Sequence, residues 1–268
     1  MSKDTVKLAC GHQMPLLRFG LWKVPKESAA DTGIKRAISE CVVKREDISI
    51  TTKLWNNYHA KEHALPMIKA QNESWVFGYI DLLLIPFPSA LGKALPRVVS
   101  VKPAKVSNQE TWKSLKAAVE QGIARSIGVS NFQGQSIYDL FTYNKHPPVI
   151  AYSSFGPQSI LELPPAFRER AEGLPSLFDI EIIKKIASKH VKTPSQILLR
   201  FATQRNIAVS PKSNNKDGLA QTLDITSFYL SKEDIDSILA LGQGLSPPNT
   251  ARSDLQRRAV RSEIWCCS

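Results

Sequence analysis

Short apolar and β-branched runs alternate with longer amphipathic segments along this chain. Strands are predicted for the runs at 47–55, 79–85, 124–132, 149–156 and 207–214. The second run, YIDLLLI, is apolar at nearly every position. Such a continuous run is typical of a strand that is covered on both faces.

The intervening segments repeat their apolar positions at helical spacing. Helices are predicted for 109–122, 193–206 and 231–241. Thr193 is a suitable N-cap residue for the second helix, and Pro194 suits its first helical position. The stretch 88–109 has no clear periodicity and is predicted to be a long loop.

Alternating strands and helices with short connections favour a parallel sheet covered by helices. In such folds the functional side chains gather at the carboxyl ends of the strands. The length of 268 residues suits one domain, residues 1–268, with a large core. The polar, proline-containing tail from about 243 is expected to be poorly ordered.

Composition and charge narrow the function classes. The formal charge is +11, but the basic residues are scattered and are not interleaved with aromatic residues, so no nucleic-acid partner is expected.

No run of about 18 apolar residues is present, so no membrane-spanning helix is predicted. The first residues lack the apolar core of a secretory leader. The cysteine spacing matches no zinc site or disulfide framework. We therefore expect a cytoplasmic protein without a metal. The cysteines are Cys10, Cys41, Cys266 and Cys267.

Several longer stretches point to one family. They are MPLLRFGLWKV, VVKREDISITTKLWNNYH, YIDLLLIPFP, ETWKSLKAAVEQGIARSIGVSNF, AYSSFGPQSILEL and TPSQILLRFATQRNIAVSPKSN. In this order they resemble the aldo-keto reductases, most closely the fungal NAD(P)H-dependent D-xylose reductase branch. The resemblance implies an α/β fold of the (β/α)₈ TIM-barrel type. It also implies NADP(H) as cofactor, with NAD(H) as the alternative, bound without a Rossmann motif.

The resemblance implies reduction of an aldehyde or ketone to an alcohol, with an aspartate, a tyrosine, a lysine and a histidine at the site. Lys53 matches the lysine. The segment expected to carry the aspartate and tyrosine is missing, and Pro86 stands at the histidine position in DLLLIPFP. A further strand expected before AYSS is also missing. We therefore expect an incomplete barrel that lacks about two strands, and turnover below a hundredth of a competent relative's.

The cofactor residues implied by the resemblance are better preserved. Those matching the nicotinamide contacts are Ser130, Asn131 and Tyr152. Those matching the pyrophosphate and ribose loop are Ser153, Ser154, Phe155, Gln158 and Glu162. Those matching the 2′-phosphate and adenosine contacts are Lys212, Ser213, Asn214 and Gln221. Trp22 matches an aromatic residue of the substrate pocket. Gly218 stands where an arginine is expected, and Gln221 replaces an acidic residue.

Each of these residues also has a purely structural interpretation. Ser130 and Asn131 could cap a helix, and Tyr152 could be part of the core. Tyr58 and His59 are expected in a solvated loop, with a role as substitute acid as the alternative. Three explanations of the gaps stay open: a mis-spliced gene model, a pseudoenzyme that binds a nucleotide or a partner, and a reductase with a rearranged site. The expected partner is a small carbonyl compound, and the expected state is a monomer or homodimer.

Overall fold

The computed structural model describes residues 5–8, 10–21, 30–75, 78–92, 103–132, 139–140, 149–152, 155, 176–213, 215–244 and 261–266. The chain divides into two compact units. The N-half unit consists of Val6–Met14, Lys23–Val149 and Ser262–Ser268. The C-half unit consists of Met1–Thr5, Pro15–Trp22 and Ile150–Arg261.

Parallel strands form the centre of the N-half unit. They are β3 (Thr51–Lys53), β4 (Leu82–Ile85) and β5 (Ile127–Ser130). Thr52 lies beside Leu83 in the register, and Leu84 lies beside Gly128. A further strand, β8 (Arg261–Cys266), pairs antiparallel with the other edge of β5. The carboxyl ends of β3, β4 and β5 therefore meet at one edge of the sheet.

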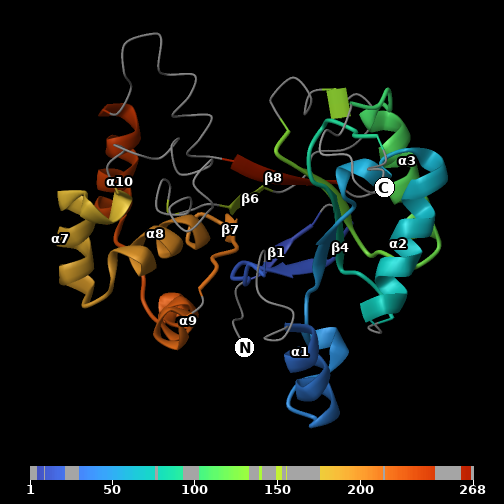
Figure 1. Ribbon diagram of the computed structural model, residues 1–268. Helices are drawn as coiled ribbons and strands as arrows, with labels where there is room; N and C mark the ends of the chain where they lie inside the picture. The colour runs from blue at the N-terminus through green and yellow to red at the C-terminus, as the bar shows by residue number, and fades with distance from the viewer. Residues whose placement is uncertain are drawn as a thin grey trace. The chain divides into compact units, whose positions relative to one another are not determined.

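Two helices, α2 (Lys61–Trp75) and α3 (Asn108–Glu120), pack side by side next to β4 (Figure 1). Ile68 of α2 and Trp112 of α3 join Leu83 and Ile127 of the strands in one buried core cluster. Burial of each such side chain contributes about 1.5–3 kcal/mol to folding. The continuous apolar run predicted as a covered strand is thus confirmed, since all four residues of β4 are buried.

An aromatic ring between two guanidinium groups links the segments that precede these strands. The guanidinium carbons of Arg45 and Arg125 lie 3.8 and 3.6 Å from the centre of the Tyr79 ring. Asp81 accepts a hydrogen bond from Arg45 at 2.9 Å and pairs with Arg125 at 3.6 Å. Charge and ring contacts together hold the amino ends of β3, β4 and β5 in place.

The remaining described elements of this part of the chain are short. The strands β1 and β2 form a two-stranded sheet, with Leu8 N donating to His12 O at 2.8 Å in the turn. The bounds are β1 (Thr5–Lys7), β2 (Gln13–Pro15), α1 (Ala30–Ser39), η2 (Arg45–Asp47) and η3 (Asn56–Tyr58).

The C-half unit contains a parallel strand pair, β6 (Val149–Tyr152) and β7 (Ala208–Val209). Leu17 forms a parallel bridge to Val209. The helices that follow and precede β7 are visible in Figure 1. Their bounds are η4 (Leu177–Asp179), α7 (Glu181–His190), α8 (Pro194–Thr203), α9 (Lys216–Leu223), η5 (Asp224–Thr226) and α10 (Lys232–Gly244).

Helix α8 begins where the sequence predicts. The Thr193 hydroxyl accepts a hydrogen bond from Gln196 N, and the Gln196 side chain accepts one from Thr193 N at 2.9 Å. This reciprocal pair satisfies two backbone donors that the first helical turn would otherwise leave unpaired. Ile197 then packs with Ile183 of α7 and Ile238 of α10 in a buried cluster.

A buried carboxylate joins α7 to α10. Asp234 accepts hydrogen bonds from Lys189 at 2.9 Å and His190 at 2.8 Å. Burial raises the pKa of Asp234, but the hydrogen bonds from His190, Lys189 and Ser231 outweigh it and hold the pKa well below its usual value. Asp234 therefore stays ionised and accepts hydrogen bonds from Lys189 and His190 of the neighbouring helix.

The mixed α/β class with parallel strands is confirmed, but the described residues do not form a closed barrel. The edge of β5 that faces away from β4 pairs with β8, which runs antiparallel to it. A barrel of the predicted type consists of parallel strands only. Residues 245–260 lie outside the described part of the chain, so the expectation of a poorly ordered tail remains a prediction there. In the described residues no helix has the length and apolar character needed to cross a membrane.

Candidate functional site

The carboxyl ends of β3, β4 and β5 bring together three predicted positions of the N-half unit. Lys53 ends β3, Pro86 follows β4, and Ser130 ends β5. Because the three strands are parallel and in register, these residues lie at the same edge of the sheet. The sequence prediction that Lys53 and the Ser130–Asn131 pair share this edge agrees with the register.

Asn131 ties the end of β5 to the end of β4. Its amide nitrogen Nδ2 donates to the Pro86 carbonyl oxygen at 2.8 Å and to Ser130 Oγ at 3.1 Å. Its backbone is left-handed, with φ of 59°, and asparagine adopts this conformation more readily than most residues. Ser130 is fully buried. These hydrogen bonds tie the pair to the end of β4.

Pro86 fills the position where the resemblance implies a histidine. The residue is buried, and its carbonyl oxygen accepts the Asn131 hydrogen bond. A proline side chain neither donates, accepts nor titrates. At this strand end, Pro86 therefore contributes only its backbone carbonyl, as an acceptor for Asn131.

The backbone of Lys53 is anchored to the neighbouring helix. Its carbonyl oxygen accepts a hydrogen bond from Gln71 Nε2 of α2 at 3.3 Å. The Lys53 residue is partly buried. This anchoring fixes the strand end from which the lysine side chain projects.

Two exposed aromatic residues follow directly on these strand ends. The side chains of Trp55, after β3, and Phe87, after β4, have ring centres 6.4 Å apart in an edge-to-face arrangement. Trp55 is 51% exposed and Phe87 38% exposed. Large aromatic residues with this exposure are suited to contact an apolar ligand surface. The sequence reasoning missed this pair, although both residues lie within two positions of a predicted strand end.

His59 lies in the core and not in a solvated loop, so that expectation was wrong. It is 1% exposed, and its carbonyl oxygen accepts a hydrogen bond from Thr111 Oγ1 of α3 at 3.1 Å. Burial lowers the pKa of His59, and a hydrogen bond to the Leu54 backbone opposes this in part. The imidazole is therefore neutral at pH 7. Tyr58, its neighbour, packs against the same core.

In the C-half unit, Lys212 and Ser213 follow β7 at its carboxyl end. Ser213 Oγ donates to Asn215 O and accepts from Asn215 N, both at 3.1 Å. A Cβ atom at Gly218 would lie 2.5 Å from this Oγ. The glycine therefore allows the Ser213 turn to approach α9, and the arginine expected there would displace the serine side chain.

Two further predicted residues of this unit have structural contacts. The ring of Phe155 packs against Phe178 with centres 5.3 Å apart, and Phe155 also contacts a buried cluster that includes Val209. The Gln221 backbone carbonyl accepts a hydrogen bond from Gln196 Nε2 at 3.0 Å. Tyr152 ends β6, and its side chain is outside the description. The predicted residues that lie outside the described part of the chain are Trp22, Ser153, Ser154, Gln158, Glu162 and Asn214.

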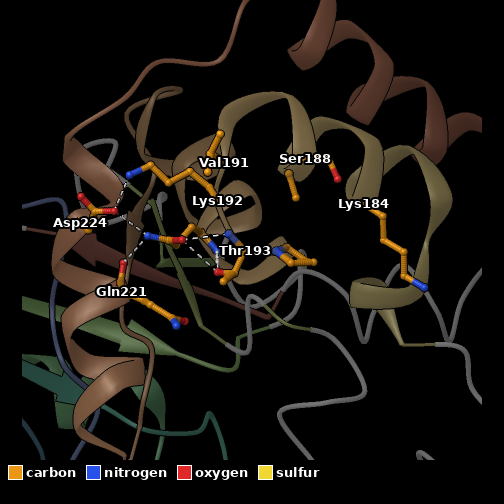
Figure 2. A pocket seen from close by; sticks show the side chains of 10 residues that line it. Lys184, Ser188, Val191, Lys192, Thr193, Gln221 and Asp224 are labelled. Carbon is orange, nitrogen blue, oxygen red and sulfur yellow. Dashed lines mark hydrogen bonds and ion pairs between the residues drawn. The ribbon is translucent and has the colours of Figure 1, made fainter.

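Figure 2 shows a hollow where α7, α8 and α9 approach one another. Its polar side chains are largely paired with each other: Lys192 donates to Asp224, and Gln196 donates to Asp224 at 2.9 Å. The hydrogen bond from Lys192 lowers the pKa of Asp224. Gln221 of α9 lines this hollow, and none of the lining residues directly follows a strand. The hollow is therefore a weaker candidate site than the strand ends.

A metal site is not found in the described residues, where no group of three or more histidine, cysteine, aspartate or glutamate side chains could hold an ion. The chemistry that the strand ends offer is instead a buried hydroxyl and amide, a lysine and an exposed aromatic pair. Such groups suit a ligand with a carbonyl or aromatic part, held by hydrogen bonds, ring contacts and the charge of the lysine.

Comparison with known proteins gives a consistent assignment. A sequence profile described as "Aldo/keto reductase family" matches residues 26–163. A protein of Emericella nidulans described as "Probable NAD(P)H-dependent D-xylose reductase" is 39% identical, over 93% of this chain and 98% of its own length. Proteins with the same description from Aspergillus clavatus and Aspergillus fumigatus are 40% and 38% identical, over 91% of this chain and 92% and 96% of their own lengths.

The alignment with the Emericella nidulans protein spans 314 positions, whereas this chain has 268 residues. The alignment must therefore contain positions at which this chain has no residue. This agrees with the prediction that segments present in the relatives are missing here.

Proposed function

Because the chain belongs to the aldo/keto reductase family, we propose that it binds a reduced nicotinamide nucleotide at the carboxyl edge of its parallel strands. We further propose that it reduces a small aldehyde or ketone much more slowly than complete members do. NADPH is the proposed cofactor, with NADH as the alternative. The observation that supports the binding half is the fixed Ser130–Asn131 pair at the end of β5.

The residues of the strand ends fit such a nucleotide. A carboxamide group is recognised by hydrogen bonds to a hydroxyl and an amide side chain, and Ser130 and Asn131 supply these at one strand end. The exposed rings of Trp55 and Phe87 would contact the substrate.

Slow turnover follows from the proton that the reaction requires. The reduced nicotinamide, when bound, supplies a hydride to the carbonyl carbon. The carbonyl oxygen must then take a proton from an acid of the protein or from water. Pro86 cannot donate one, and the segment expected to carry the family tyrosine is missing from this chain. Loss of a general acid alone costs about 10²–10⁴-fold in rate.

Lys53 is the remaining family residue of the reaction. An ammonium group near the developing oxyanion would stabilise negative charge there. Lys53 can therefore support a residual reaction in which water provides the proton. The alternative proposal is that the chain binds the nucleotide but does not reduce a carbonyl compound. It also rests on Pro86, which stands where a histidine is expected, and it differs only in that no measurable rate of reduction remains.

The test is a titration of the folded chain with NADPH and with NADH, followed by tryptophan fluorescence. We expect saturable quenching, and a decrease in affinity of at least about tenfold in Asn131→Ala, which removes the amide side chain proposed to bind the carboxamide group. Asn206→Ala is the matched control, because Asn206 also has a left-handed backbone but lies in the turn after α8. A folded chain with no saturable response to either nucleotide would refute the proposal.

A further inference from the structure

The strand β5 is paired along both of its edges by segments that are distant in the sequence. On one edge it pairs with β4 in parallel. On the other edge it pairs with β8 from the far end of the chain, in an antiparallel register that places Val129 opposite Ile264 and Ile127 opposite Cys266. Both sides of β5 are therefore part of a hydrogen-bonded sheet.

The direction of each backbone amide of β5 follows from one printed contact. Leu83 N of β4 donates to Ser126 O at 2.9 Å, so the peptide groups of Ser126 face β4. Successive residues of a strand direct their N–H and C=O groups to alternate edges. Gly128 therefore also faces β4, whereas Ile127 and Val129 face β8.

These β8-facing groups lie in a buried environment. All four residues of β5 are buried, and Ile127 and Val129 belong to the main core cluster of the N-half unit. A buried amide or carbonyl without a partner costs about 1–3 kcal/mol, and an open strand edge also invites pairing with other molecules. The edge of β5 that faces away from β4 thus requires an extended partner.

We propose that this edge of β5 is a strand-acceptor surface, and that the segment Arg261–Cys266 of the same chain is its occupant. The segment acts as an intramolecular strap. It forms hydrogen bonds with the backbone N–H and C=O groups of Ile127 and Val129, and it keeps this edge of β5 from pairing with a second molecule. Ile264 and Trp265 are residue types favoured in strands. The mode of recognition is addition of an antiparallel strand through main-chain hydrogen bonds, which needs no preformed pocket.

Hydrogen exchange of individual amides tests the strap. In the intact chain we expect the amides of Ile127, Gly128 and Val129 to be protected. In a chain that ends at residue 260, we expect the amides of Ile127 and Val129 to exchange at least about tenfold faster. The Gly128 amide should keep its exchange rate, because it is bonded to β4. Gly128 is therefore an internal control within the same strand.

A second variant covers the case in which the shortened chain does not fold. Ile264→Pro removes the N–H group that faces the Val129 carbonyl and so weakens the pairing of the segment with β5. It should therefore increase exchange at Val129 more than at Gly128. A synthetic peptide with the sequence of residues 258–268, added to the shortened chain, should restore protection of Ile127 and Val129.

Each outcome decides the proposal. If the shortened chain becomes a dimer in which Ile127 and Val129 are protected, a second copy has taken the surface and its strand-acceptor character is supported. If the shortened chain stays monomeric with unchanged protection of both amides, the proposal is overturned. It is overturned equally if Ile127 and Val129 exchange freely in the intact chain while Gly128 is protected.

Discussion

Replacement of Asn131 by alanine combines two losses at the end of β5. The side chain donates to the Pro86 carbonyl at 2.8 Å and to Ser130 Oγ at 3.1 Å, and each hydrogen bond contributes about 1 kcal/mol net. The left-handed backbone, with φ of 59°, adds about 1–2 kcal/mol for a residue such as alanine. We therefore expect Asn131→Ala to lower the free energy of unfolding by about 3–4 kcal/mol.

Two matched variants separate these contributions. Asn131→Gly loses the same hydrogen bonds but adopts the left-handed backbone without strain, so it should be more stable than Asn131→Ala by about 1 kcal/mol. Asn206→Ala, at a φ of 57° in the C-half unit, should report the backbone cost alone, about 1–2 kcal/mol.

Urea unfolding followed by circular dichroism measures all three variants, with the slope of the transition compared to confirm a single cooperative step. Equal stability of Asn131→Ala and Asn131→Gly would refute the argument from the backbone. A loss in Asn131→Ala no larger than that in Asn206→Ala would refute the argument from the side-chain hydrogen bonds.

Other perturbations test the core and the helix contacts. Asp234→Asn removes the buried charge that accepts hydrogen bonds from Lys189 and His190, so it should cost about 1.5–3 kcal/mol at pH 7. Because the pKa of Asp234 is lowered in the folded state from its usual value of 3.8, the wild-type advantage is complete above that pH and decreases below it, which urea unfolding from pH 3 to pH 7 can follow. His59 has a lowered pKa from a usual value of 6.5, so the neutral form stabilises the fold above pH 6.5 and stability falls as the pH decreases below it. His59→Gln should flatten this decrease between pH 7 and pH 5 in thermal melts, and an unchanged slope would contradict the assignment. Tyr79→Leu removes the ring that contacts Arg45 and Arg125 and should cost about 1–3 kcal/mol, whereas a neutral effect in urea unfolding would show that the ring contacts contribute nothing.

The elements with strong local signals could be predicted from the sequence. Thr193 and Pro194 mark the start of α8 because the cap depends on residues only three positions apart. The strand β4 could be predicted because its apolar run is continuous. Its place in a parallel sheet follows from the alternation of strands and helices.

Features that depend on contacts between distant segments could not be predicted. His59 is buried because Thr111 and the α3 core cover it, and its neighbours in the sequence are polar enough to suggest a loop. The left-handed backbone of Asn131 depends on its contact with Pro86, 45 positions away. The strand β8 lies in a tail that is expected to be poorly ordered, and it pairs with β5, which is distant in the sequence.

In the candidate site, too, features with a local sequence signal could be predicted, and features that depend on contacts between distant segments could not. The residue types at the strand ends, Lys53, Ser130 and Asn131, could be placed because each lies near the end of a predicted strand. The aromatic pair of Trp55 and Phe87 could not, because two residues after different strands become neighbours only when the register is known. Pro86 could be identified as a substituted position, but its role as acceptor for Asn131 required the geometry.

The central claim is that the chain keeps a nucleotide-binding strand edge and lacks the proton donor of its relatives. Steady-state oxidation of NADPH with a simple aldehyde, measured beside the Emericella nidulans relative under identical conditions, tests it most directly. We predict a kcat at least about a hundredfold below that of the relative, together with saturable NADPH binding. A kcat equal to that of the relative would contradict the account, because it would require an acid that neither Pro86 nor His59 supplies.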